Sequence, residues 1–213
     1  AVKERPLLEG ESMVLALLRG DKTQERRLIV PQPCEVPYQN VFGEADSAVF
    51  WRHGEKKEDW PTPERCPYGK PGDRLWVKET WRTWEREDLV DGVVYRADGA
   101  FRPIESTPNA AEAWMQAHAN GRHYLRWRPS SVMPRFAARI FLDLVDVRVA
   151  RLLDMNEADA RAEGVAPQGD GPAPHLAAYR LFWEEHHKDH AAWPMNPYVW
   201  VLTYRRIEVP GGR

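Results

Sequence analysis

Polar and charged residues crowd the segment "LLRGDKTQERR", in which an apolar run ends at Gly20. A lysine beside a carboxylate in a partly dry pocket can act as a general base or orient a nucleophile once its pKa falls. Lys22, Thr23 and Glu25 supply the residue types for that chemistry. A charge run after a helix is otherwise the solvated end of that helix. The segment is therefore either one wall of a ligand site or a solvated turn, and the residues alone leave both open.

Other polar residues stand at the ends of predicted elements, which is where sites are usually built. Lys78 and Glu79 leave a predicted strand, Arg135 and Arg139 precede a long strand, and Glu163 closes a helix. Each of these side chains, taken singly, is typical of a solvated surface. Only their meeting in space would make a site.

Other kinds of site find little support in the sequence. His186, His187 and His190 surround Asp189, but the glutamate of an HExxH motif and a third ligand are missing, so we expect a solvated helix end and no metal. The serine pair in "RPSSV" lacks the glycines of a nucleophile elbow. The phosphate-binding loops GxGxxG and GxxxxGK[ST] are absent from the sequence. We therefore expect no cofactor.

The charge balance limits the class of partner. The chain has 213 residues, 30 Lys+Arg against 32 Asp+Glu, a net charge of −2 and a pI of about 6.4. With no global basic field, contact with a polyanion must come from a local patch. The chain contains 10 tryptophans, which is a large number for its length. Aromatic rings can stack on nucleobases, with a stabilisation of roughly 1–3 kcal/mol per base. The composition favours a small planar ligand or a short single strand over long duplex.

The sequence also bears on compartment. No stretch approaches the roughly 18 consecutive apolar residues of a membrane span, and "AVKERPLLEG" lacks the apolar segment of a signal peptide. Cys34 and Cys66 are far apart without CxxC spacing, which indicates reduced thiols. We expect a cytoplasmic protein with no membrane partner, and the sequence leaves its oligomeric state open.

Apolar periodicity and turn residues predict the elements that must position the polar side chains. A helix over 11–19 ends at Gly20, and the turn Pro71-Gly72-Asp73 leads into a strand over 75–78. The other predicted elements are short strands within 26–33 and 92–98, helices within 108–120, 154–165 and 175–190, and long strands within 137–152 and 196–209. This order predicts one α+β domain over 1–213, with insertions at about 34–65 and 100–122 and a mixed sheet that closes into a small barrel.

Six segments, taken in order, resemble the ASCH domain family, in particular its longer phage and prophage-encoded members. They are "GDKTQERR", "CPYGKPGDRLWVKETW", "YRAD", "WRPSSVMPRFAARI", "RVARLLDMNEADARAEGV" and "NPYVWVLTYRR". The resemblance covers most of the chain outside the two insertions. It implies a PUA-like fold, which is a small β-barrel with flanking helices, and a cleft suited to RNA or a modified nucleoside.

Small bacterial members of that family are N4-acetylcytidine amidohydrolases. The resemblance places their catalytic lysine on Lys22 and their catalytic glutamate on Glu163. Their catalytic threonine falls on Glu25, whose carboxylate could serve only as a base for water, or not serve at all. Thr23 keeps a hydroxyl two positions earlier, and a neighbouring lysine can deprotonate a hydroxyl for attack on an amide.

Two functions of different classes follow. In the first, the protein is a hydrolase that removes an acyl group from a modified base, with Lys22 and Glu163 as base and orienter and with Glu25 or Thr23 activating the nucleophile. In the second, which the changed threonine favours, it is a non-catalytic module that binds RNA, DNA or a modified nucleotide through the same cleft. A third role, in phage assembly or host interaction, would use the fold only as a scaffold.

The residues expected to contact the ligand are divided by chemistry. Aromatic rings stack on a base, and cationic side chains contact phosphates or an oxyanion. The expected contact residues are Arg26, Arg27, Lys78, Glu79, Trp81, Tyr95, Trp127 and Arg135.

Overall fold

The computed structural model describes residues 2–33, 38–39, 45–46, 65–105, 107–119, 126–187 and 191–208. The chain divides into two compact units. Unit 1 comprises Ala1–Thr23, Gly72–Leu144 and Tyr204–Arg213, and unit 2 comprises Gln24–Pro71 and Val145–Thr203. Each unit draws on segments that are far apart in the sequence, and the two are described separately. That the chain is one domain stays a prediction.

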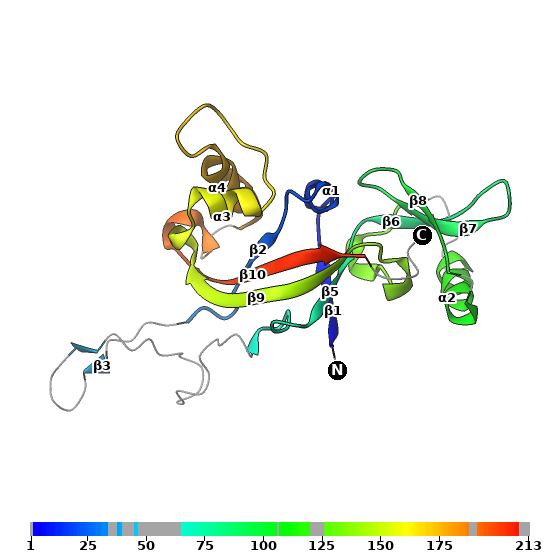
Figure 1. The fold of residues 1–213 in the computed structure, drawn as a ribbon, viewed down its shortest axis with the longest axis horizontal. Coiled ribbons are helices and arrows are strands. Elements are labelled where there is room, and N and C mark those ends of the chain that lie inside the picture. Colours follow the sequence, from blue (N-terminus) through cyan, green and yellow to red (C-terminus); the bar gives the residue numbers. More distant parts are fainter. Residues whose placement is uncertain are drawn as a thin grey trace. The chain divides into compact units, whose positions relative to one another are not determined.

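Three strands of unit 1 form a core through apolar alternation. Strand β1 (Glu4–Leu8) pairs in parallel with β5 (Arg74–Lys78), and β5 pairs antiparallel with the first part of β9 (Phe141–Arg151) (Figure 1). Alternate side chains of a strand point to opposite faces, so Leu75 and Val77 share one face. Both are at most 1% exposed. The strand predicted over 75–78 is confirmed.

Helix α1 (Glu11–Arg19) confirms the helix predicted over 11–19. Its buried residues lie along one side, and Gly20 ends it in the left-handed conformation at φ +82°, which glycine adopts without the steric cost of a Cβ. The backbone N–H of Lys22 still donates to the Ala16 carbonyl, at 3.3 Å. The end of this helix therefore fixes the backbone where the charged segment begins.

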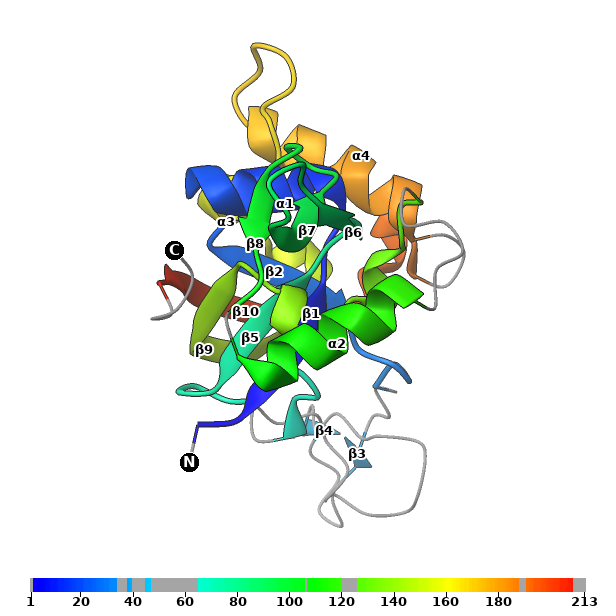
Figure 2. The same ribbon diagram turned by 90° about the vertical axis from the view of Figure 1, so that its right-hand side faces the viewer.

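A second sheet of unit 1 contains three antiparallel strands in the order β6-β7-β8. Their bounds are β6 (Trp81–Glu85), β7 (Asp91–Tyr95) and β8 (Phe101–Pro103). Helix α2 (Pro108–Ala119) packs against β6 and lies beside this sheet in both views (Figures 1 and 2). Two short 3-10 helices, η3 (Ser130–Val132) and η4 (Arg135–Ala137), precede β9. The strand predicted within 92–98 and the helix within 108–120 are confirmed.

One face of this three-stranded sheet carries a buried cluster. Trp81, Val93 and Tyr95 share that face and pack with Met133 and Ala137. The Tyr95 hydroxyl donates to the Ala137 carbonyl at 2.8 Å, so its one polar atom is satisfied within the core.

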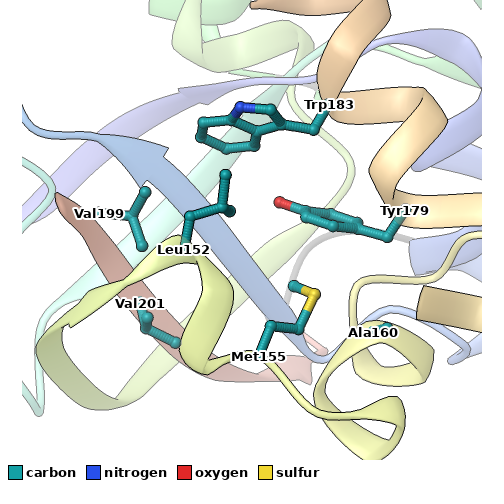
Figure 3. Close-up of a cluster of buried hydrophobic side chains, with 7 residues drawn as sticks. All are labelled: Leu152, Met155, Ala160, Tyr179, Trp183, Val199 and Val201. Atoms are coloured by element: carbon teal, nitrogen blue, oxygen red, sulfur yellow. The ribbon is translucent and has the colours of Figure 1, made fainter. Parts of the chain in front are cut away.

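Unit 2 places two helices against a strand pair. Strand β2 (Gln24–Leu28) pairs antiparallel with β10 (Tyr198–Ile207), and α3 (Glu157–Ala162) packs on both β2 and α4 (Pro174–His186). The core between them contains Tyr179 and Trp183 of α4, Met155 and Ala160 beside and within α3, Val199 and Val201 of β10, and Leu152 of the 3-10 helix η5 (Leu152–Asp154) (Figure 3). A further 3-10 helix, η7 (Trp193–Met195), precedes β10. The predicted helices within 154–165 and 175–190 and the final strand are confirmed.

The start of α3 also organises the start of α4. Asn156 caps α3 by accepting the backbone N–H of Asp159 at 2.9 Å. Helix α4 has no side-chain cap of its own. The Glu157 carboxylate instead accepts the backbone N–H groups of His175 and Leu176 at 3.0 and 2.9 Å. One carboxylate thus satisfies the free donors of α4 and fixes α4 against α3.

The α+β class is confirmed, but the closed barrel is wrong. The largest sheet has the strand order β1-β5-β9-β10-β2, so β1 and β2 are its ends and the sheet is open. A barrel requires its first and last strands to pair. Strand β1 has only five residues and contains Pro6, which lacks a backbone N–H.

The two predicted insertions differ in how far the structure describes them. Within 34–65 it describes only Arg65 and a strand pair, β3 (Tyr38–Gln39) with β4 (Ala45–Asp46). The segment predicted at about 100–122 contains β8 and α2. No helix among the described residues is long and apolar enough to cross a membrane.

Gly92→Ala tests the packing of the three-stranded sheet. A Cβ at Gly92 would lie 2.3 Å from the Phe101 ring and 2.6 Å from the Arg102 carbonyl oxygen, and the carbonyl cannot move without breaking the β7-β8 pairing. We expect a loss of about 1–3 kcal/mol in unfolding free energy, measured by urea denaturation. Gly171→Ala is the matched control, because nothing lies within 4 Å of its added Cβ. Equal stability of the two variants would contradict this packing.

Candidate functional site

The centre of the candidate site in unit 2 is a buried ion pair. The Arg26 guanidinium lies 2.8 Å from Glu163 Oε1, and the two side chains are 1% and 3% exposed. The backbone N–H of Arg26 donates to Glu163 Oε2 at 3.3 Å, so one residue contacts both carboxylate oxygens. Glu163 is the C-cap of α3, and Gly164 follows in the left-handed conformation. The end of α3 therefore aims Glu163 at β2.

Two further side chains complete the surroundings of Arg26. Its guanidinium lies 3.1 Å from Asp159 Oδ2 and donates to the Gln24 side-chain oxygen. Asp159 is also 3.7 Å from the exposed Arg148. Asp159 and Glu163 are four residues apart on α3 and so share one face of the helix. That face presents two carboxylates to a single buried arginine.

Glu25 and Arg27 flank this pair on β2. Glu25 is buried, and its Oε1 lies 2.7 Å from Arg27 Nε. The Arg27 guanidinium is 6.0 Å from the centre of the Tyr68 ring. Burial raises the pKa of the Tyr68 hydroxyl above its ordinary value. Where a threonine was expected from the resemblance, the structure thus places a buried carboxylate with a cationic partner.

Lys22 and Thr23 belong to unit 1 and differ sharply in exposure. Lys22 is 4% exposed, whereas Thr23 is exposed and its carbonyl accepts the backbone N–H of Tyr204 at 3.0 Å. Burial of a lysine is expensive unless the ammonium is compensated, so a solvated turn does not describe this segment. Because Glu25 and Glu163 belong to unit 2, a shared cleft with Lys22 stays a prediction.

A second cluster of charges lies at the junction between β5 and β6 in unit 1. Glu79 is 1% exposed, and both its oxygens accept hydrogen bonds from Arg139 at 2.8 Å. The same guanidinium contacts Asp98 at 2.7 and 3.0 Å and lies 3.9 Å from the centre of the Tyr95 ring. Arg139 therefore ties the start of β6 to the turn that follows β7.

Burial and ion pairing shift the pKa values of Glu79 and Arg139 in opposite directions. Burial raises the pKa of Glu79, although hydrogen bonds from Arg139 work in the opposite direction. Burial also opposes the charge on Arg139, but hydrogen bonds to Glu79 and Asp98 outweigh it and raise the pKa of the guanidinium. Burial raises the pKa of Tyr95 to about 12. Arg139 thus remains charged between its two carboxylates.

The remaining expected contact residues are more accessible. Lys78 donates to the Ser131 carbonyl, and its ammonium lies 5.6 Å from the Trp76 ring centre. Arg135 is exposed and pairs with Glu4 at 2.8 Å. Its hydrogen bond lowers the pKa of the Glu4 carboxyl, a shift that burial partly opposes. Trp127 is half-buried, with the Arg82 guanidinium 4.6 Å from its ring centre.

Three expected ligand contacts do not fit the structure. Trp81 and Tyr95 are 1% and 0% exposed in the core of the three-stranded sheet, so neither presents a face to a base. The Arg26 guanidinium is engaged by two carboxylates and an amide, so the expected phosphate contact does not fit it either. Apolar alternation along β6 and β7 places these rings inward, and β2 with α3 encloses the arginine.

Metal binding has no geometric support in the part of the chain that the structure describes. Those residues contain no group of three or more His, Cys, Asp or Glu that could hold a metal ion. His186 and His187 are described, and their rings lie against Phe182 and Trp183. Asp189 and His190 lie outside the described residues.

Comparisons with protein-family models, with curated proteins and with solved structures return no match to this chain. The resemblance to the ASCH family is therefore not tested by them.

Arg26→Ala tests the buried ion pair. Removing one partner of a buried pair leaves the other charge uncompensated, and we expect a loss of about 3–5 kcal/mol in unfolding free energy. Arg148→Ala is the control, because its side chain is 44% exposed and 3.7 Å from Asp159; exposed pairs contribute about 1 kcal/mol or less. The double variant Arg26→Met/Glu163→Leu should recover part of the loss. Similar effects of Arg26→Ala and Arg148→Ala in urea denaturation would refute this role.

Proposed function

We propose that the protein binds a modified nucleobase or nucleoside, either free or within a single strand, and that its fold is PUA-like. The observation that carries the proposal is burial. Four charged side chains that the sequence alone makes typical of a solvated surface are at most 7% exposed: Lys22, Glu25, Arg26 and Glu163. Buried charges are costly and concentrate at functional sites. The resemblance to the ASCH family implies a ligand cleft in these same segments.

The polar groups suit the edge of a pyrimidine. A carboxylate accepts an N–H from a base, and an ammonium donates to a carbonyl oxygen. We assign the acceptor role to Glu163, which Arg26 holds in one orientation by two hydrogen bonds. The resemblance gives the donor role to Lys22; because Lys22 belongs to unit 1, its meeting with Glu163 at one ligand stays a prediction. An acyl group on the exocyclic amine would add a second carbonyl for a donor to recognise.

Binding is favoured over hydrolysis by the position of Glu25. An amidohydrolase that uses a threonine nucleophile needs a hydroxyl where this chain has a carboxylate paired with Arg27 at 2.7 Å. A carboxylate at this position can activate water but cannot itself give the acyl-enzyme that a threonine hydroxyl forms. Hydrolysis of N4-acetylcytidine to cytidine and acetate remains the second candidate, because the lysine and glutamate of the resemblance are both present and buried.

Binding is tested by titrating N4-acetylcytidine into the protein and following tryptophan fluorescence and heat release. We expect saturable binding that Lys22→Met weakens at least tenfold, because a buried donor to the ligand is lost. Lys3→Met is the matched control, since Lys3 is exposed. Absence of saturable binding, or equal affinities for the Lys22→Met and Lys3→Met proteins, would rule out this assignment.

Hydrolysis is tested separately, by incubating the protein with N4-acetylcytidine and separating the products by chromatography. We expect binding without release of cytidine, because the nucleophilic threonine is replaced. Cytidine release that disappears in both Lys22→Ala and Glu25→Gln would instead establish the enzyme and assign water activation to Glu25. If neither binding nor release occurs, the fold is better explained as a scaffold for a macromolecular interaction.

A further inference from the structure

We propose that the outward face of the β6-β7-β8 sheet binds single-stranded nucleic acid by stacking bases on Trp84 and Trp127. The inference extends the proposed function from a nucleoside to the strand that carries it, and it rests on that function only for the class of ligand. It concerns a surface of unit 1 alone. Of its residues, only Trp127 was expected to contact a ligand.

Strand β6 has two chemically distinct faces. Trp81 and Thr83 are each 1% exposed and share the face whose buried cluster contains Trp81. Arg82 and Trp84 alternate with them and are half-buried, so they lie on the opposite face. Helix α2 contributes Ala117 to the buried cluster and therefore covers the inner face. The outer tryptophan is not part of that cluster.

Trp127 joins this outer face from a neighbouring segment. Trp81 and Arg128 form an antiparallel bridge with two backbone hydrogen bonds of 3.2 and 2.8 Å. In that register Trp127 lies beside Arg82. The Arg82 guanidinium is 4.6 Å from the Trp127 ring centre and 4.7 Å from the Trp84 ring centre. The Arg82 guanidinium thus lies close to one indole of its own strand and to a second indole of the neighbouring segment.

A second pair of the same kind lies on this face. Phe101 of β8 is opposite Val94, which is opposite Arg82. The Phe101 ring occupies the space above Gly92, where a Cβ would come within 2.3 Å of it. The Arg86 guanidinium lies 5.3 Å from the centre of that ring. The face therefore combines three partly exposed rings with two arginines.

This composition selects a nucleic-acid strand as the occupant. Bases stack on aromatic rings and on guanidinium planes, and phosphates pair with arginine. Exposed Arg126 precedes Trp127, which makes that end of the face cationic. Acidic residues lie at the far end of β6: Glu85 is its last residue, Glu87 and Asp88 are in the turn that follows, and Asp88 pairs with Arg86 at 3.0 Å. Five strand residues span about 17 Å, enough for a few stacked nucleotides.

The test is fluorescence anisotropy with labelled, unmodified U12 and dT12 and with a duplex of the same length. We expect both single strands to bind more tightly than the duplex, with an affinity that falls as salt rises. Trp84→Leu, which keeps an apolar side chain but removes the ring, should weaken binding between about 5- and 100-fold. Trp84→Tyr should retain most of the affinity. Arg96→Ala is the charge control for Arg82→Ala, because Arg96 is 53% exposed and pairs with Glu11 of α1.

Two results would overturn the proposal. One is that oligonucleotide binding is absent or does not depend on this face. In that case neither oligonucleotide binds, or Trp84→Leu binds it as tightly as Trp84→Tyr and Arg82→Ala as tightly as Arg96→Ala. The other is that Trp84→Leu changes the oligomeric state by size-exclusion chromatography without changing oligonucleotide affinity, which would make the face a protein contact. Circular dichroism of each variant establishes that it is folded. Titration of free N4-acetylcytidine separates this proposal from the nucleoside site, because Trp84→Leu should leave that binding unchanged.

Discussion

The ion pair between Arg26 and Glu163 carries two full charges into the interior of unit 2. Both side chains are at most 3% exposed, and a buried charge without its partner would cost about 3–5 kcal/mol, a large share of the folding free energy of a domain. The ion pair therefore constrains how β2 and α3 are oriented. Strand β2 must present Arg26 inward, α3 must end so that Glu163 faces the strand, and Asp159 must lie on the same helix face. The apolar cluster of Tyr179 and Trp183 then packs α4 against that arrangement.

Unit 1 also contains an arginine that is paired with two carboxylates, at the junction of β5 and β6. Arg139 is held by the carboxylates of Glu79 and Asp98, with the Tyr95 ring beneath it. These contacts join segments 41 and 60 residues apart in the chain. In both units an arginine therefore fixes the end of a regular element through carboxylates. Binding residues commonly lie at the ends of regular elements, where a rigid scaffold positions them. The carboxylates that hold these arginines are positioned in that way.

The sequence predicted local features well and long-range ones poorly. Helices α1 and α3 were predictable because Gly20 and Asn156 provide strong termination and capping signals. Strand β1 was missed because it contains Pro6 and pairs with residues 70 positions away, and β6 was missed because Arg82 and Trp84 hide its alternation. The prediction of a closed barrel was wrong for the same reason, because closure depends on long-range pairing between the two edge strands of the sheet. Burial of Lys22 and Glu163 could not be read from composition. The shared helix face of Asp159 and Glu163 could have been predicted from the sequence, because the two residues are four positions apart.

The central proposal is that the buried charges of β2 and of the end of α3, both in unit 2, belong to a nucleoside site. The most direct measurement is the change in amide chemical shifts of ¹⁵N-labelled protein on addition of N4-acetylcytidine. The account predicts saturable shifts concentrated in residues 21–27 and 161–165, with β6 to β8 little affected by the free nucleoside. A spectrum that does not change, or changes confined to β6, β7 and β8, would contradict it.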